Sequence, residues 1–220
     1  MSYVLYVIDT ETTGLDENKH DIIEICLWRI GDLESKTWCL TPFNPANIEN
    51  EALAVNHHKR EDILHKTAIG REKYRDPKSV LSEIEMYLME DCAAAEDRVI
   101  VGQNPNFDYK FMLKLWEKCG DIEAFPFGYW IDNKDGTKRN QSMLFDTIDM
   151  VKMIDFCTGR QRKRYNLGSL VKDFHVTKAQ AHVAYGDVKM TKDLFETVFN
   201  RIKDVVKDRF DDCYAPTTEE

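Results

Sequence analysis

The chain has 220 residues, of which 43% are hydrophobic and 31% are charged, a balance typical of a globular protein with one sizeable core. Its formal net charge of -9 argues against a protein that coats nucleic acid, because such proteins are basic. No apolar run approaches the roughly 20 residues of a membrane span, and the N-terminus shows no basic segment followed by an apolar signal core.

The six cysteines are scattered, with no CxxC pair and no short spacing to histidine. This usage indicates reduced, mostly buried thiols and argues against a disulfide or zinc framework. We therefore expect a cytoplasmic protein without a membrane partner.

Strand signals dominate the first part of the chain. Apolar runs at residues 3–8, 21–30 and 36–43 predict three strands, and Gly31-Asp32 is a turn signal between the last two. Because the connections are short, these strands should form an antiparallel meander.

Helices then alternate with single strands. The expected helices cover residues 51–58, 60–69, 79–92, 108–119, 146–157, 165–173 and 184–208, and two buried strands are expected at 98–104 and 143–145. The order predicts an α/β fold with a mixed central sheet, an antiparallel meander plus parallel strands, flanked by helices.

Two further segments stand apart from this pattern. Residues 125–142, first aromatic and then polar, predict a hairpin or a long loop that could shape access to a site or bind a partner. We expect one domain over residues 1–208 and a disordered acidic tail over residues 209–220.

The first strand ends in the stretch VIDTETTGL, where Asp9 and Glu11 are spaced one residue apart. Side chains two positions apart on a strand point to the same face, so the two carboxylates should lie side by side. One interpretation is a strand that runs into a solvated turn, with Gly14 allowing the chain to reverse. The other is a site for a divalent cation, and this stretch alone leaves both open.

Two helices carry the second signal. Asp108 is at the N-terminal end of an apolar stripe on the helix over residues 108–119, and Asp187 has the same place on the final helix. An acid at a helix N-terminus is favoured by the helix dipole and is common. Two such acids together with the pair Asp9 and Glu11 favour a four-carboxylate cluster.

Four carboxylates suit hard cations that prefer oxygen ligands, such as Mg²⁺ or Mn²⁺. A pair of such ions is the usual means of phosphodiester cleavage. His182, five residues before Asp187, is the candidate general base, since its unperturbed pKa near 6.5 suits proton transfer at neutral pH. The other histidines are expected to be exposed polar residues: His20, His57, His58, His65 and His175.

The stretches VIDTETTGL, VGQNPNFDYKFM and AHVAYGDVKMT resemble, in order and spacing, the three motifs of the DnaQ-like 3′–5′ exonucleases. The spacing His-x-Ala-x-x-Asp at His182 resembles that of the DEDDh branch. The resemblance covers residues 3–203 and implies a ribonuclease H-like fold and a metal-dependent 3′–5′ exonuclease with two divalent cations.

The resemblance also implies roles for single residues. Asp9 would bind both ions, Asp108 and Asp187 would each hold one, and Glu11 would support an ion and the terminal 3′-hydroxyl. His182 would be the base.

Substrate contacts follow in the same way from the family pattern. Backbone groups around Thr12 and Thr13 would hold the last nucleotide, and the side chain of Leu15 would wedge against its base. Phe107 would line the same pocket, and Asn104 belongs to the second motif.

The nature of the substrate stays open at this point. The chain also resembles ribonuclease T, an RNA-trimming relative with aromatic residues at several base-stacking positions. Phe107 and Phe145 match two of these positions, whereas Leu15 and Val55 occupy two others. The leading hypothesis is an exonuclease on single-stranded or frayed DNA 3′ ends, in proofreading or repair. The alternatives are RNA 3′-end trimming and a non-catalytic module associated with a polymerase.

Partners follow from these hypotheses. A single-stranded nucleic acid 3′ end is the expected substrate, and a polymerase or a second copy of the chain would be a further partner. The basic run at residues 159–166 (GRQRKRYN) is either a solvated loop or an edge that contacts phosphates.

Overall fold

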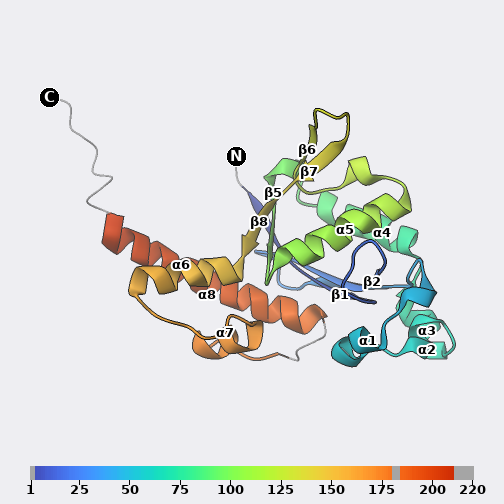
Figure 1. The fold of residues 1–220 in the computed structure, drawn as a ribbon, viewed down its shortest axis with the longest axis horizontal. Helices are drawn as coiled ribbons and strands as arrows, with labels where there is room; N and C mark the ends of the chain where they lie inside the picture. The colour runs from blue at the N-terminus through green and yellow to red at the C-terminus, as the bar shows by residue number, and fades with distance from the viewer. Residues whose placement is uncertain (1–2, 180–183, 211–220) are drawn as a thin grey trace.

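The structure, a computed structural model, describes residues 3–179 and 184–210, without the side chains of residues 205–210. A six-stranded sheet with the strand order β4-β3-β2-β1-β5-β8 forms its centre, and a separate two-stranded sheet pairs β6 with β7 (Figure 1). The strands are β1 (Val4–Thr12), β2 (Ile22–Arg29), β3 (Lys36–Leu40), β4 (Tyr74–Arg75), β5 (Arg98–Gly102), β6 (Tyr129–Asp132), β7 (Lys138–Gln141) and β8 (Met143–Asp146).

The predicted meander is confirmed, because β1 pairs with β2 and β2 with β3 in antiparallel register. The strands β5 and β8 extend the sheet in parallel on the other side of β1. The first strand is longer than predicted: it continues through Asp9 and Glu11 to Thr12. The reason is that β2 pairs with this whole stretch, with Asp9 opposite Cys26 and Glu11 opposite Glu24.

Helices cover both faces of the sheet. They are α1 (Asn50–Asn56), α2 (Arg60–Ile63), α3 (Ala68–Lys73), α4 (Pro77–Met89), α5 (Pro105–Cys119), α6 (Thr147–Thr158), α7 (Leu167–Asp173) and α8 (Ala184–Phe210). The helices α4 and α5 pack on one face, while α8 crosses the other face with α6 and α7 beside it (Figure 1). This is the ribonuclease H-like arrangement that the motifs imply.

The two predicted apolar stripes lie in the core. On α5, the residues Phe111, Met112 and Leu115 are buried. On α8, Leu194 and Val198 are fully buried and pack against α6 and α7. On α5 the stripe therefore faces the sheet, whereas on α8 the stripe faces α6 and α7, and Ala184, Val188 and Phe195 form the side of α8 that packs on the sheet.

Three expectations need correction. The predicted helix over residues 60–69 is two short helices, α2 and α3, because the backbone of His65 adopts a left-handed conformation between them (φ 57°). The strand β8 is half-buried, since it forms one edge of the sheet. Among the described cysteines only Cys26 and Cys39 are buried, so the thiols are not mostly buried.

Of the two predicted alternatives for residues 125–142, a hairpin or a long loop, the structure shows the hairpin, with β6 and β7 antiparallel. Phe125 and Phe127 at its start are buried in the core against α4 and α5, and the Tyr109 hydroxyl donates a hydrogen bond to the Asn140 carbonyl oxygen at 3.0 Å. Among residues 3–179 and 184–210, no helix is both long and apolar enough to cross a membrane.

Candidate active site

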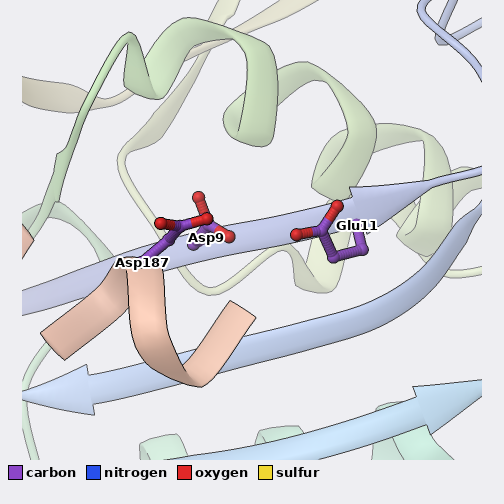
Figure 2. A group of neighbouring side chains, drawn as sticks. All are labelled: Asp9, Glu11 and Asp187. Atoms are coloured by element: carbon purple, nitrogen blue, oxygen red, sulfur yellow. The ribbon is translucent and has the colours of Figure 1, made fainter. Parts of the chain in front are cut away.

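Three carboxylates from two elements meet beside the centre of the sheet. Asp9 and Glu11 project from β1 and Asp187 from the first turn of α8, with one ligand oxygen of each within 4.8 Å of the others (Figure 2). All three side chains are partly exposed. We call these three residues the carboxylate cluster.

The cluster follows from the local structure of both elements. Asp9 and Glu11 alternate with Thr10, so strand geometry puts both acids on the face that α8 covers. There, Ala184 and Val188 of α8 pack against Val7 in one buried apolar group. This packing holds the first turn of α8, and with it Asp187, beside the strand.

Asp108 lies outside the cluster and is buried. Its Oδ1 atom accepts two hydrogen bonds from Thr10, one from the backbone N–H and one from the hydroxyl, each 2.8 Å long. Asp108 still acts on the cluster electrostatically, because its negative charge raises the pKa values of Asp9 and Glu11. The fourth predicted acid is therefore adjacent to the three clustered acids.

The acids show the electrostatic cost of this crowding. Burial, followed by the charges of Asp108, Glu11 and Asp187, raises the pKa of Asp9 well above its usual value. Burial and the charge of Asp187 raise the pKa of Glu11 to about 8. Burial also raises the pKa of Asp108 to about 7, although its hydrogen bonds from Thr10 act in the opposite direction.

Such a donor set fits a divalent cation. Carboxylate oxygens are the ligands that Mg²⁺ and Mn²⁺ prefer, and a cation would remove the repulsion that keeps these acids protonated. The three clustered acids supply the closest oxygens.

A pocket of about 320 Å³ opens on one side of the cluster, and we call it the β1 pocket. Glu11 belongs to both the cluster and this pocket. Three of the predicted substrate-binding residues line it: Thr12, Leu15 and Phe107. The rest of its wall consists of Thr10, Glu49, Glu51, Ala52, Val55 and Asn56.

The other two predicted substrate-binding residues do not line this pocket. Thr13 is fully buried, its N–H donates to the Asp21 carbonyl and its own carbonyl accepts from the Glu49 N–H, each at 2.9 Å. Asn104 is exposed and occupies the N-cap position of α5 in a left-handed conformation (φ 62°). Both residues thus shape the backbone around the site.

A second pocket, of about 460 Å³, opens on the other side of the cluster, and we call it the α8 pocket. Asp9 and Asp187 form part of its wall. The remaining lining residues are Gln103, Asn166, Leu167, Gly168, Lys178, Ala179 and Met190. The cluster thus lies between two hollows.

The family model RNase_T, described as an exonuclease, matches residues 6–195. The chain belongs to this exonuclease family. The match confirms the resemblance to DnaQ-like enzymes, and the chain is a 3′–5′ exonuclease that hydrolyses phosphodiester bonds.

Individual relatives agree with the family. Ribonuclease T of Klebsiella pneumoniae is 26% identical over 207 residues, which cover 90% of this chain and 85% of that protein. Ribonuclease T of Shewanella baltica is 25% identical over 211 residues, which cover 91% of this chain and 83% of that protein.

Solved structures support the same fold. Exonuclease I of Methylocaldum szegediense superposes with a TM-score of 0.67 and 17% identity over 95% of this chain. Exonuclease I of E. coli in complex with a 5cy-dT13 oligonucleotide gives a TM-score of 0.65 and 13% identity over 96% of this chain. The present chain covers 43% of the length of each of these two exonuclease I proteins.

Two histidines of the exonuclease differ from expectation, and one lies where the structure does not test it. His182 lies outside the described residues, two positions before the first residue of α8. The expectation that the other histidines are exposed is wrong for His20 and His58, which are buried. The His20 ring lies against Gly14, where an added Cβ would come within 2.5 Å of it, so Gly14 is required by close packing and not by a reversal with positive φ.

The basic run of the exonuclease is partly structural. The side chain of Arg162 is only 4% exposed and forms ion pairs with Asp155 and Asp173. Lys163 and Arg164 are exposed. Only the exposed members of this run are available to phosphate.

Sequence reasoning missed three residues of the site. Thr10 holds Asp108. The Asn56 amide donates to the Thr12 carbonyl at 3.1 Å and lines the β1 pocket. Glu24 lies opposite Glu11 in the register of the sheet. A carboxylate inside the apolar strand IIEICLWR was the available signal for Glu24, whereas the other two depend on contacts between distant segments.

Proposed function

We propose that this exonuclease uses two divalent cations, Mg²⁺ or Mn²⁺, to release nucleoside monophosphates from the 3′ ends of single-stranded or frayed DNA, as proofreading or repair requires. The supporting observation is the position of the carboxylate cluster between two pockets. Glu11 is shared with the β1 pocket, and Asp9 and Asp187 are shared with the α8 pocket.

In this proposal the terminal nucleoside occupies the β1 pocket. Leu15, Val55 and Phe107 offer the base an apolar surface, and stacking on such a surface tolerates any base. Three carboxylates, those of Glu11, Glu49 and Glu51, belong to the same wall. They favour an end with a hydroxyl and repel an end with a phosphate.

The nucleotide that precedes the scissile bond occupies the α8 pocket. Lys178 supplies a positive charge at its wall, and Gln103 and Asn166 supply neutral polar groups. The Gln103 side chain is held in place because its amide donates to the Tyr165 carbonyl at 2.7 Å. Such contacts position a phosphate backbone without reading the base.

The acids of the site would hold the cations, with Asp9, Glu11 and Asp187 as direct ligands and Asp108 at their side. A bound divalent cation supplies a Lewis acid and lowers the pKa of water. His182 would accept the proton of the attacking water, a role that suits histidine because an unperturbed imidazole has a pKa near 6.5.

A second candidate is the trimming of RNA 3′ ends. It is favoured by the similarity to ribonuclease T over more than four fifths of the length of those relatives. Against it, Phe107 is the one aromatic side chain in the wall of the β1 pocket as far as the structure describes it. Phe145 packs against Phe195 instead, with ring centroids 6.3 Å apart.

The test uses single-stranded DNA and RNA of the same base sequence, labelled at the 5′ end, with Mg²⁺ and with EDTA. We expect stepwise shortening in Mg²⁺ that is faster for DNA, no reaction in EDTA, and no reaction of Asp187→Asn under either condition. Faster shortening of RNA would replace the leading proposal with the second candidate. Cleavage in EDTA would contradict the metal dependence.

A further inference from the structure

A fifth buried acid, Glu24, lies one strand away from the carboxylate cluster. It is opposite Glu11 in the register of β1 and β2, and its side chain is 4% exposed. Its negative charge raises the pKa values of Asp9 and Glu11, so it makes the crowding of the cluster worse.

One oxygen of Glu24 contacts the helix that carries Asp187. Its Oε1 atom accepts a hydrogen bond from the backbone N–H of Ala184 at 3.0 Å. Ala184 is the first residue of α8, and its N–H is one of the first-turn donors that have no partner inside a helix. A carboxylate at this end of a helix also interacts favourably with the helix dipole.

The other oxygen of Glu24 is held by a different part of the fold. Its Oε2 atom lies 3.3 Å from the Cys39 Sγ atom, 3.4 Å from His58 Nε2 and 3.6 Å from Lys73 Nζ. His58 in turn contacts the Tyr74 hydroxyl through Nδ1. These partners come from β3, the α1–α2 connection and the end of α3, so the direction of the carboxylate is fixed from several sides.

The two contacts connect both sides of the active site. Ala184 and Asp187 are three residues apart, which places them one turn apart on the same side of α8. His58 follows Asn56, which lines the β1 pocket. A single carboxylate thus joins the first turn of α8 to the segment that forms the pocket wall.

We propose that Glu24 is a positioning residue, whose Oε1 atom fixes the first turn of α8 and thereby the distance of Asp187 from Asp9 and Glu11. This inference rests on the proposed metal-dependent function. Groups that orient a metal ligand typically change metal affinity or activity about 10–100-fold when they are replaced.

Two substitutions separate the length of this side chain from its charge. Glu24→Asp keeps the charge but withdraws the oxygen from Ala184 by about 1.5 Å, the length of one C–C bond. Glu24→Gln removes the charge and keeps an acceptor oxygen in reach. In Glu24→Gln, the amide can donate to His58, which stays neutral because burial lowers its pKa to about 4. Lys73 is exposed enough to turn toward water and so avoid the amide.

The experiment measures Mn²⁺ affinity by titration calorimetry and the single-turnover rate on single-stranded DNA. We expect Glu24→Asp to lose about 10–100-fold in both, with an unchanged KM for DNA, and Glu24→Gln to retain most of both. Lys73→Met is the matched control, since it removes a partner of Glu24 without touching Ala184, and it should behave as wild type.

Two results would overturn the proposal: wild-type Mn²⁺ affinity in Glu24→Asp, or an equal loss in Glu24→Gln, which would show that an acceptor oxygen in reach of Ala184 is not what sets the affinity. If Glu24→Asp does not fold, amide hydrogen exchange of wild-type Ala184 decides, because rapid exchange would show that Glu24 does not hold it. If wild type itself neither binds Mn²⁺ nor cleaves DNA, the proposed function fails, and the Ala184 exchange still tests the contact.

Discussion

The Oδ1 atom of Asp108 lies 2.8 Å from both the backbone nitrogen and the hydroxyl oxygen of Thr10. Thr10 stands between Asp9 and Glu11 on β1 and points to the opposite face of the sheet. One threonine therefore fixes the helix α5 to the strand that carries two acids of the cluster. Its hydrogen bonds also lower the pKa of Asp108 and so partly offset the effect of burial.

Replacement of this hydroxyl tests its role. In Thr10→Val the backbone bond remains and the hydroxyl bond is lost, which should lower the free energy of unfolding by about 1–2 kcal/mol. The exonuclease rate in Mg²⁺ should fall about 10–100-fold, since Asp108 loses a group that orients it. Urea denaturation and single-turnover hydrolysis measure the two effects.

Thr41→Val is the control for this substitution, because it removes a hydroxyl contact to the Arg75 carbonyl far from the cluster. It should reduce stability at most and leave the rate unchanged. An unchanged rate in Thr10→Val would show that Asp108 does not depend on Thr10.

Asp9→Ala should abolish exonuclease activity and yet leave the protein folded. The raised pKa of Asp9 shows that its negative charge is unfavourable in the metal-free fold, so its removal should leave the stability equal or slightly higher. Thermal unfolding in EDTA measures this. A variant that keeps the wild-type rate in Mg²⁺ would rule out Asp9 as a metal ligand.

The raised pKa of Glu11 predicts how stability changes with pH. Burial and the charge of Asp187 raise this pKa to about 8 from an ordinary value of 4.5. Between these two values the folded state holds a proton that the unfolded state has lost, so stability falls as pH rises. In EDTA, wild type should become less stable from pH 5 to 8, and Glu11→Gln should show a smaller loss.

The difference between the two proteins isolates Glu11 from other titrating groups. Denaturant unfolding at several pH values provides the measurement, and added Mn²⁺ should restore wild-type stability near pH 8 because the cation replaces the proton. Parallel pH profiles of wild type and Glu11→Gln in EDTA would contradict the crowding of the cluster.

His182→Ala tests the assignment of the general base. Loss of a general base typically costs about 10²–10⁴-fold in rate, while the carboxylates suffice to bind the cation. The variant should therefore bind Mn²⁺ and single-stranded DNA as wild type does and cleave far more slowly in a single turnover. His175→Ala, at an exposed position, is the control. A large loss of Mn²⁺ affinity, or an undiminished rate, would assign His182 a different role.

The sequence predicts those parts of the fold that depend on local pattern. The alternation around Asp9 and Glu11 predicts their shared face, and the apolar stripes on α5 and α8 predict that Asp108 and Asp187 lie at the N-terminal ends of core-facing stripes. The order and spacing of the three motifs also indicated the exonuclease family. The first two signals depend only on residues within one strand or one helix.

What the sequence does not predict depends on contacts between distant segments. The two residues of β4 form a strand only because β3 lies beside them. The break between α2 and α3 goes with close packing at Gly70, where a Cβ would come within 2.1 Å of the Asp62 carbonyl oxygen. Likewise, the contacts of Glu24 with Ala184, 160 positions away, require the finished sheet.

The proposed function requires that a free 3′-hydroxyl lies beside the carboxylate cluster. The sharpest test compares the hydrolysis in Mg²⁺ of two single-stranded DNAs that carry the same 5′ label and differ in a 3′-hydroxyl or a 3′-phosphate. The acidic wall formed by Glu11, Glu49 and Glu51 predicts one-nucleotide shortening of the first and little reaction of the second. Equal hydrolysis of both, or release of the label as a mononucleotide from the 5′ end, would rule out this mode of binding.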